Sequence, residues 1–64
     1  MISAREREVL IGVASGQTDK EIAAALDISP RTVESHRESL MRKLDIRSVA
    51  GLTKLAVEEG LLAG

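Results

Sequence analysis

The sequence contains no cysteine, no phenylalanine, tyrosine or tryptophan, and a single proline among its 64 residues. Without cysteine there is no disulfide and no thiolate zinc site. Proteins that read single-stranded nucleic acid usually stack the bases on aromatic rings, so that class of binder is disfavoured. The longest apolar runs are a few residues, far short of the roughly 20 that a membrane-spanning helix needs, and nothing resembles a signal peptide. We therefore expect one small, soluble, cytoplasmic domain.

An enzyme is not expected. The sequence holds no nucleophile–base pair and no spacing typical of metal ligands. A chain of this length buries only about 60% of its unfolded surface, which leaves little room for a substrate pocket. We expect no metal and no cofactor.

The segment from Ser29 to Leu44 has the clearest pattern in the chain and predicts one long helix. Ser29 is a preferred N-cap residue, and Pro30 fits the first helical position. Val33, Leu40 and Leu44 recur on one face at helical spacing. The opposite face carries only polar side chains, namely Arg31, Glu34, Ser35, Arg37, Glu38 and Arg42. A helix of this kind suits a DNA major groove, and it equally suits an ordinary solvated surface.

Three shorter helices are predicted around the long one. The four expected helices cover residues 3–15, 18–26, 29–44 and 48–59. The first two begin with the capping-box pattern, Ser3 with Glu6 and Thr18 with Glu21, and Ser48 caps the last. The chain therefore reads as four helices in series.

The second and third helices are joined only by Asp27 and Ile28. Because the link is so short, the two helices must cross steeply, which is the helix-turn-helix arrangement. Ala23 and Ala24 are small enough to allow a close approach. Within the last helix, Gly51 is expected to cost up to ~1 kcal/mol relative to alanine.

Aliphatic side chains at helical spacing predict an inward face on each shorter helix. They are Val9, Leu10, Val13, Ala14, Ile22, Ala23, Leu26, Leu52, Leu55 and Ala56. A different face of the last helix, formed by Val49, Thr53 and Val57, would be exposed in a monomer. It is either a contact surface or a set of scattered surface residues.

Charge is unevenly distributed along the chain, although the net charge is only −1. Residues 29–44 carry four basic and two acidic side chains, whereas residues 1–28 carry three basic and five acidic ones. Positive charge is therefore concentrated on the long helix, as a DNA-binding helix requires. The excess is small, so ordinary solvated charge is an alternative.

Several groups of residues occur in the order and at the spacings of a known family. They are Arg5-Glu6-Arg7-Glu8-Val9-Leu10 with Gly16, Lys20-Glu21-Ile22-Ala23 with Leu26, Ile28-Ser29, Thr32-Val33, His36-Arg37, Lys43-Leu44, Ala56, Gly60 and Leu61-Leu62. Together they resemble the LuxR/FixJ (GerE-type) DNA-binding domain, in particular the output domain of FixJ/NarL response regulators. The resemblance covers nearly the whole chain, and the ordered set is far more specific than any single piece.

The resemblance implies an all-α, four-helix LuxR-type helix-turn-helix domain that forms a homodimer and binds double-stranded DNA. Its third helix would read the major groove, and its fourth would mediate a dimer that is weak without DNA. The residues expected at the DNA backbone are Lys20, Ser29, Arg31, Thr32, His36 and Lys43. Those expected at base edges are Glu34, Ser35, Glu38 and Arg37, the last being either a base reader or a phosphate clamp. The expected dimer interface is Val49, Thr53 and Val57.

Glu34 and Glu38 depart from the family pattern, because relatives carry lysine at such positions. Acidic readers favour the N4 donor of cytosine and repel phosphate, so a relative's target site cannot be transferred. Three other residues have simpler alternatives. Lys20 could be a surface lysine, Thr32 could bond its own helix, and His36 could pack against the second helix or act as a switch.

Full-length family members are controlled by a receiver or sensor domain, and RNA polymerase is a further partner that the resemblance allows. The 64 residues hold no such regulatory domain. We expect either a fragment that begins at an added Met1 or a stand-alone family member. Two other functions stay open: a helical protein-interaction module that acts without DNA, and a domain similar to sigma-factor region 4, which the matching fourth helix argues against.

Overall fold

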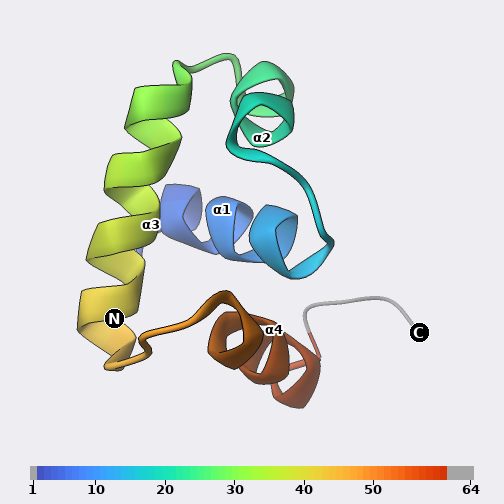
Figure 1. Cartoon of the computed structure of the whole chain (residues 1–64), viewed down its shortest axis with the longest axis vertical. Helices are drawn as coiled ribbons and strands as arrows, with labels where there is room; N and C mark the ends of the chain where they lie inside the picture. The colour runs from blue at the N-terminus through green and yellow to red at the C-terminus, as the bar shows by residue number, and fades with distance from the viewer. Residues whose placement is uncertain (1, 61–64) are drawn as a thin grey trace.

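Four α-helices follow one another in the computed structural model, which describes residues 2–60 (Figure 1). They are α1 (Ala4–Ala14), α2 (Asp19–Leu26), α3 (Pro30–Leu44) and α4 (Val49–Glu58). The all-α, four-helix fold predicted from the sequence is confirmed, and each helix begins and ends within one residue of the expected position.

A hydroxyl side chain caps the start of every helix. The caps are Ser3, Thr18, Ser29 and Ser48, and each accepts a hydrogen bond from the amide three residues later. In the first two helices a glutamate returns the bond. The Glu6 carboxylate accepts from the Ser3 amide at 2.8 Å, and the Glu21 carboxylate accepts from the Thr18 amide at 2.8 Å. Both capping boxes are thus confirmed, and local sequence fixes where the helices start.

Two helices end at an aspartate in the left-handed conformation. Asp27 follows α2 with φ 57°, and Asp45 follows α3 with φ 54°. In both cases the next residue is an isoleucine whose amide bonds back into the helix, Ile28 to the Ala23 carbonyl at 3.0 Å and Ile46 to the Met41 carbonyl at 2.9 Å. Both isoleucines are half-buried against the core. Each turn therefore ends a helix and returns an apolar side chain to the interior.

Helix α1 is the centre of the packing. It contacts each of the other three helices, and α3 packs against both α1 and α2. In Figure 1, α3 runs along one side of α1, while α2 and α4 lie on opposite sides of it. The largest fully buried side chains come from all four helices, and they are Leu10, Ile22, Leu40, Leu52, Val9 and Val33. This aliphatic core holds α3 with its polar side outward.

Most of the predicted inward residues are buried, with some differences at the edges. Ala14, Leu26, Leu44 and Leu55 are only half-buried. Ala24 is exposed, so its expected role in close helix approach is wrong, whereas Ala23 is buried at 2% exposure. None of the helices in residues 2–60 is both long and apolar enough to cross a membrane.

Gly51 has a packing role that the sequence analysis did not anticipate. A Cβ atom at this position would lie 2.7 Å from Cγ2 of Ile46. The missing side chain lets the turn before α4 fold back onto the helix. The conformational cost of this glycine is therefore accompanied by a close contact that alanine would disrupt.

Candidate nucleic-acid interface

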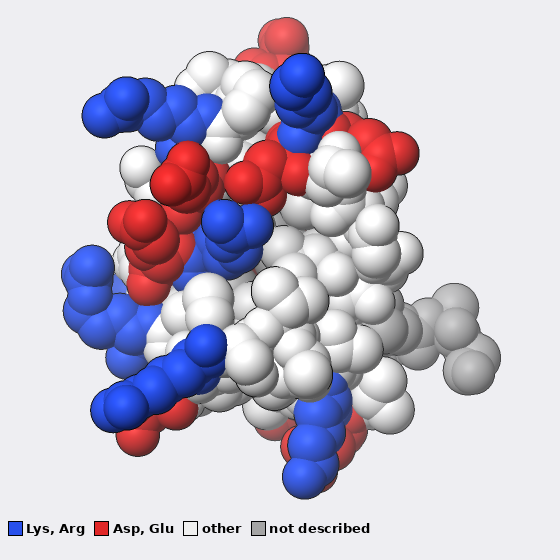
Figure 2. Space-filling model, viewed as in Figure 1, with Lys and Arg blue, Asp and Glu red and all other residues white. Residues whose placement is uncertain are grey.

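The outward face of α3 is a row of exposed polar side chains. Arg31, Glu34, Ser35 and Glu38 are exposed and surround one shallow hollow on the helix surface. Exposed Arg42 lies one turn beyond Glu38 on the same side, four residues further along. Figure 2 shows the charged side chains along the edge of the molecule that α3 forms, where acidic groups lie between basic groups. The row presents hydrogen-bond acceptors at its centre and cationic donors at both ends.

The start of α3 is fixed by a local hydroxyl pair. The Ser29 side chain accepts from the Thr32 amide at 3.1 Å, and the two hydroxyl oxygens are hydrogen-bonded at 2.8 Å. The simpler alternative for Thr32, a bond to its own helix, is therefore present in the structure. Both residues remain exposed at the helix N-terminus, where the free amides and the helix dipole favour an anion such as phosphate.

Arg37 is separate from the outward row, because it turns toward α2. Its guanidinium donates to the Asp19 carboxylate at 2.9 Å, and both side chains are 30% exposed. Lys20 follows Asp19 on α2 and is exposed. Arg37 and Lys20 both line an open hollow between the start of α2, α3 and the start of α4. Of the two roles considered for Arg37, this position favours a backbone contact over base reading.

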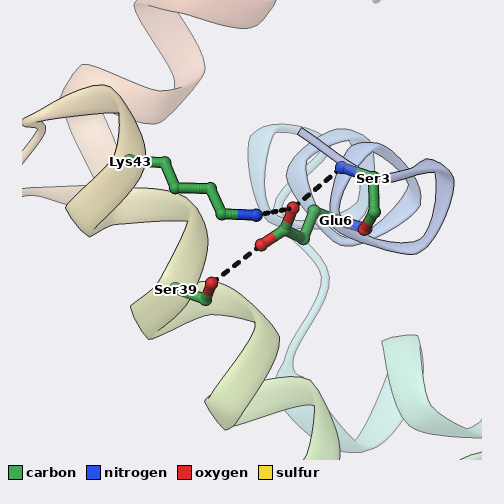
Figure 3. A network of polar contacts seen from close by, with 4 residues as sticks. All are labelled: Ser3, Glu6, Ser39 and Lys43. Carbon is green, nitrogen blue, oxygen red and sulfur yellow. Dashed lines mark hydrogen bonds and ion pairs between the residues drawn. The ribbon is translucent and has the colours of Figure 1, made fainter. Parts of the chain in front are cut away.

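Lys43 belongs to a polar network that joins α3 to the start of α1 (Figure 3). Its ammonium donates to the Glu6 carboxylate at 2.9 Å, and the Ser39 hydroxyl donates to the other carboxylate oxygen at 2.9 Å. Glu6 is only 3% exposed, whereas the Lys43 side chain is 47% exposed. The Ser3 amide first, then Lys43 and Ser39, lower the pKa of Glu6 to about 2. Lys43 therefore anchors a buried carboxylate while part of its side chain faces solvent.

The remaining candidates lie on other surfaces. His36 is half-buried on α3. On α4, Val49 and Val57 are 51% and 62% exposed, the large apolar side chains that the described residues leave most open to solvent. Thr53, between them, is half-buried and donates its hydroxyl to the Val49 carbonyl at 3.1 Å. The two valines thus form a free apolar surface away from the core residues Leu52 and Ala56.

The sequence analysis missed two acidic partners of the α3 cations. Asp19 was given no role of its own, and Glu6 was considered only as part of a capping box and of the family pattern. A signal for Glu6 existed in the spacing of Ser39 and Lys43, which are four residues apart and so present two donors on one side of α3. No local pattern could pair them with Glu6, which is 33 and 37 residues away in sequence.

Comparison with known proteins gives a consistent family. The profile described as bacterial regulatory proteins, luxR family, matches residues 1–56. The chain is 48% identical over 59 residues to the transcriptional regulatory protein FixJ of Rhizobium meliloti, covering 92% of this chain and 29% of that protein. It is 38% identical over 60 residues to the response regulator UvrY of Escherichia coli, covering 94% of this chain and 28% of that protein.

A solved structure shows the same fold. The crystal structure of full-length FixJ from B. japonicum superposes with a TM-score of 0.84 at 42% sequence identity, covering 97% of this chain and 30% of that one. The chain thus spans less than a third of the length of these relatives.

Proposed function

This chain belongs to the luxR family of bacterial regulatory proteins, a family of DNA-binding transcription regulators and not of enzymes, and on that premise we propose that it reads an inverted-repeat DNA site as a dimer. The observation that supports this most directly is the exposed row on α3, held outward by the packing of α3 against α1 and α2. In a helix-turn-helix the second helix of the motif lies in the major groove, which makes this row the reading surface.

Backbone contacts position the domain on the duplex and carry little sequence information. We assign them to Lys20 and to the exposed start of α3, where Ser29, Arg31 and Thr32 lie together. His36 and Lys43 are proposed as further backbone contacts on the sides of α3. Lys43 still has ammonium donors to offer a phosphate after bonding Glu6.

Base reading is assigned to the centre of the row. Glu34, Ser35 and Glu38 are exposed at helical spacing and meet at one hollow. A glutamate accepts a hydrogen bond from the N4 amino group of cytosine, whereas guanine presents only acceptors in the major groove. We therefore expect a site with cytosine on the contacted strand at one or two positions.

The α4 surface of Val49, Thr53 and Val57 is proposed as the dimer interface. A two-fold pair would set the two copies of α3 about 34 Å apart, one turn of DNA, and would require an inverted repeat. One short helix from each subunit buries little area, so the dimer is expected to form mainly on DNA.

The relatives support a place in signalling, because they include a response regulator and a transcriptional regulatory protein. We propose that the chain acts as the output part of such a regulator, in the bacterial cytoplasm where the chromosome lies. Contact with RNA polymerase stays a prediction.

A salt titration of duplex binding tests the proposal. Binding should weaken steeply with salt, and Lys20→Ala should reduce the log–log slope by about one unit for one lost phosphate contact. The matched control is Lys54→Ala, at an exposed position of α4, and it should leave the slope unchanged. Absence of salt-dependent duplex binding would favour the alternative, a protein-interaction module that acts through α4.

A further inference from the structure

Within residues 2–60, two ion pairs connect α3 to α1 and to α2, and they differ in how readily they can break. Lys43 pairs with Glu6, whose side chain is 4% exposed, whereas Arg37 and Asp19 are both 30% exposed. A buried carboxylate that loses its partner is left as an uncompensated charge. A partly exposed carboxylate can be rehydrated instead, and pairs that solvent reaches contribute less to stability. Arg37 is therefore the cation of the two that can change partner.

The surroundings of Arg37 suit a second anion. The hollow that it lines has a volume of about 540 Å³, and Lys20 and the Thr18 cap also line it. Asp19 is the one acidic side chain among the lining residues. The Arg37 guanidinium has about five donors, of which one bonds Asp19, and its planar fork also fits two oxygens of a phosphate.

We propose that Asp19 is an affinity-determining residue for DNA, because its carboxylate competes with a backbone phosphate for the guanidinium of Arg37. The proposal rests on the proposed function and specifies how one part of the interface is controlled. When a phosphate enters the hollow beside Lys20, Arg37 turns to it, and Asp19 is left in solvent. The ion pair thus lowers affinity for every duplex alike, since a phosphate contact carries no sequence information.

The experiment compares binding of a labelled random-sequence duplex of about two helical turns (~20 base pairs) to the full chain and its variants, by fluorescence anisotropy. Asp19→Asn removes the competing charge and keeps an acceptor oxygen. Glu21→Gln is the matched control, because it removes one charge from the same first turn of α2, keeps the capping box and leaves Arg37 untouched. Arg37→Gln and the Asp19→Asn/Arg37→Gln double variant complete the cycle. Circular dichroism checks that each variant keeps its helices.

Asp19→Asn is expected to bind about two- to fivefold more tightly than the unmodified chain, the range that a partly exposed ion pair allows. Glu21→Gln should show a smaller gain, and the gain from Asp19→Asn should vanish when Arg37 is glutamine. Three outcomes would each contradict the proposed competition. They are an equal gain in Asp19→Asn and Glu21→Gln, a gain that persists without Arg37, and no gain at all. If the unmodified chain bound no duplex at any salt concentration, the proposed function would fail first, and this inference with it.

Discussion

Glu6 accepts hydrogen bonds from three groups, the Ser3 amide before α1 and the Ser39 hydroxyl and Lys43 ammonium of α3. These bonds favour the charged carboxylate and lower its pKa from 4.5 to about 2. Because the pKa is lower in the folded state, the carboxylate stabilises the fold fully above about pH 5, near the unfolded value. That contribution is lost as the pH falls from about 5 to 2. We expect the thermal midpoint to fall over this range.

The control for this pH dependence is Glu6→Gln, which keeps an acceptor for the Ser3 amide but carries no charge. The variant should be less stable than the unmodified chain at pH 7, and the difference between the two midpoints should shrink as the pH falls toward 2 and Glu6 itself becomes protonated. A difference of constant size from pH 7 to pH 2 would show that the Glu6 charge does not stabilise the fold.

Glu34 provides the residue-scale prediction for DNA reading. Glutamine at this position keeps the exposed helical location and adds an amide donor, so the preference for a cytosine amino group should relax toward adenine, the base that glutamine contacts in bidentate fashion. We expect a penalty of roughly 1–3 kcal/mol at the original site and a changed preference at one or two positions in a randomised-site selection. Arg42→Gln is the comparison for a cation at the end of the row. An unchanged consensus for Glu34→Gln would remove this residue from the base-reading set.

At the scale of the element, the ends of α2 and α3 share the tripeptide Leu-Asp-Ile, at residues 26–28 and 44–46. Both aspartates adopt a left-handed conformation that disfavours side chains with a Cβ, and a negative charge also opposes the dipole at a helix end. We expect Asp45→Gly to stabilise the fold by about 0.5–1 kcal/mol, a rise of a few degrees in thermal midpoint.

Two further variants at Asp45 separate the effect of the charge from the effect of the backbone conformation. Asp45→Asn removes the charge but tolerates the left-handed conformation, and it should give part of the gain. Asp45→Ala removes the charge without relieving the backbone and should gain nothing or lose stability. If alanine stabilised as much as glycine, backbone conformation would not be the cause.

For Gly51→Ala, packing predicts a loss of stability, whereas helix propensity alone predicts a gain. Alanine favours a helix interior by up to ~1 kcal/mol, but its Cβ would lie 2.7 Å from the Ile46 branch methyl, and overpacking costs about 1–3 kcal/mol. Gly51→Ala should therefore lower the free energy of unfolding by up to ~2 kcal/mol. Adding Ile46→Leu, which moves the branch away from Cβ, should recover most of the loss in urea unfolding. A stabilising Gly51→Ala would show that the turn relaxes easily.

The limits of sequence-based prediction follow from these elements. The hydroxyl caps, the capping boxes and the 3.6-residue periodicity are local, so the helix bounds and the buried faces could be predicted. The partners of Arg37 and Lys43 could not, because Asp19 and Glu6 lie 18 and 37 residues away and meet them only through tertiary packing. The role of Gly51 was hidden in the same way, since it depends on a neighbouring turn.

At the scale of the whole molecule, α4 has two exposed valines that the monomer leaves uncovered. Val57 is a better test site than Thr53, because it is 62% exposed and Thr53 is half-buried. Val57→Glu should set like charges against each other across a two-fold pair while leaving the core intact. We expect an unchanged thermal midpoint, normal binding to a single half-site and loss of cooperative binding to the full site.

The control for added charge is Ala4→Glu, at an exposed first-turn position of α1. It should bind both half-site and full site much as the unmodified chain does. Equal losses on half-site and full site for Val57→Glu, or no loss on either, would show that dimerisation does not use this face of α4.

The packing of α1 against α4 also has a consequence for synthesis on the ribosome. Of the four helices α1 is made first, yet it packs against α4, which is made fourth. A nascent chain that has exposed only α1, α2 and α3 holds the whole helix-turn-helix, but its core lacks the buried Leu52 and Ala56 of α4. Helix α3 is therefore translated before the core that holds it is complete, and we expect stable folding to wait until α4 has left the exit tunnel.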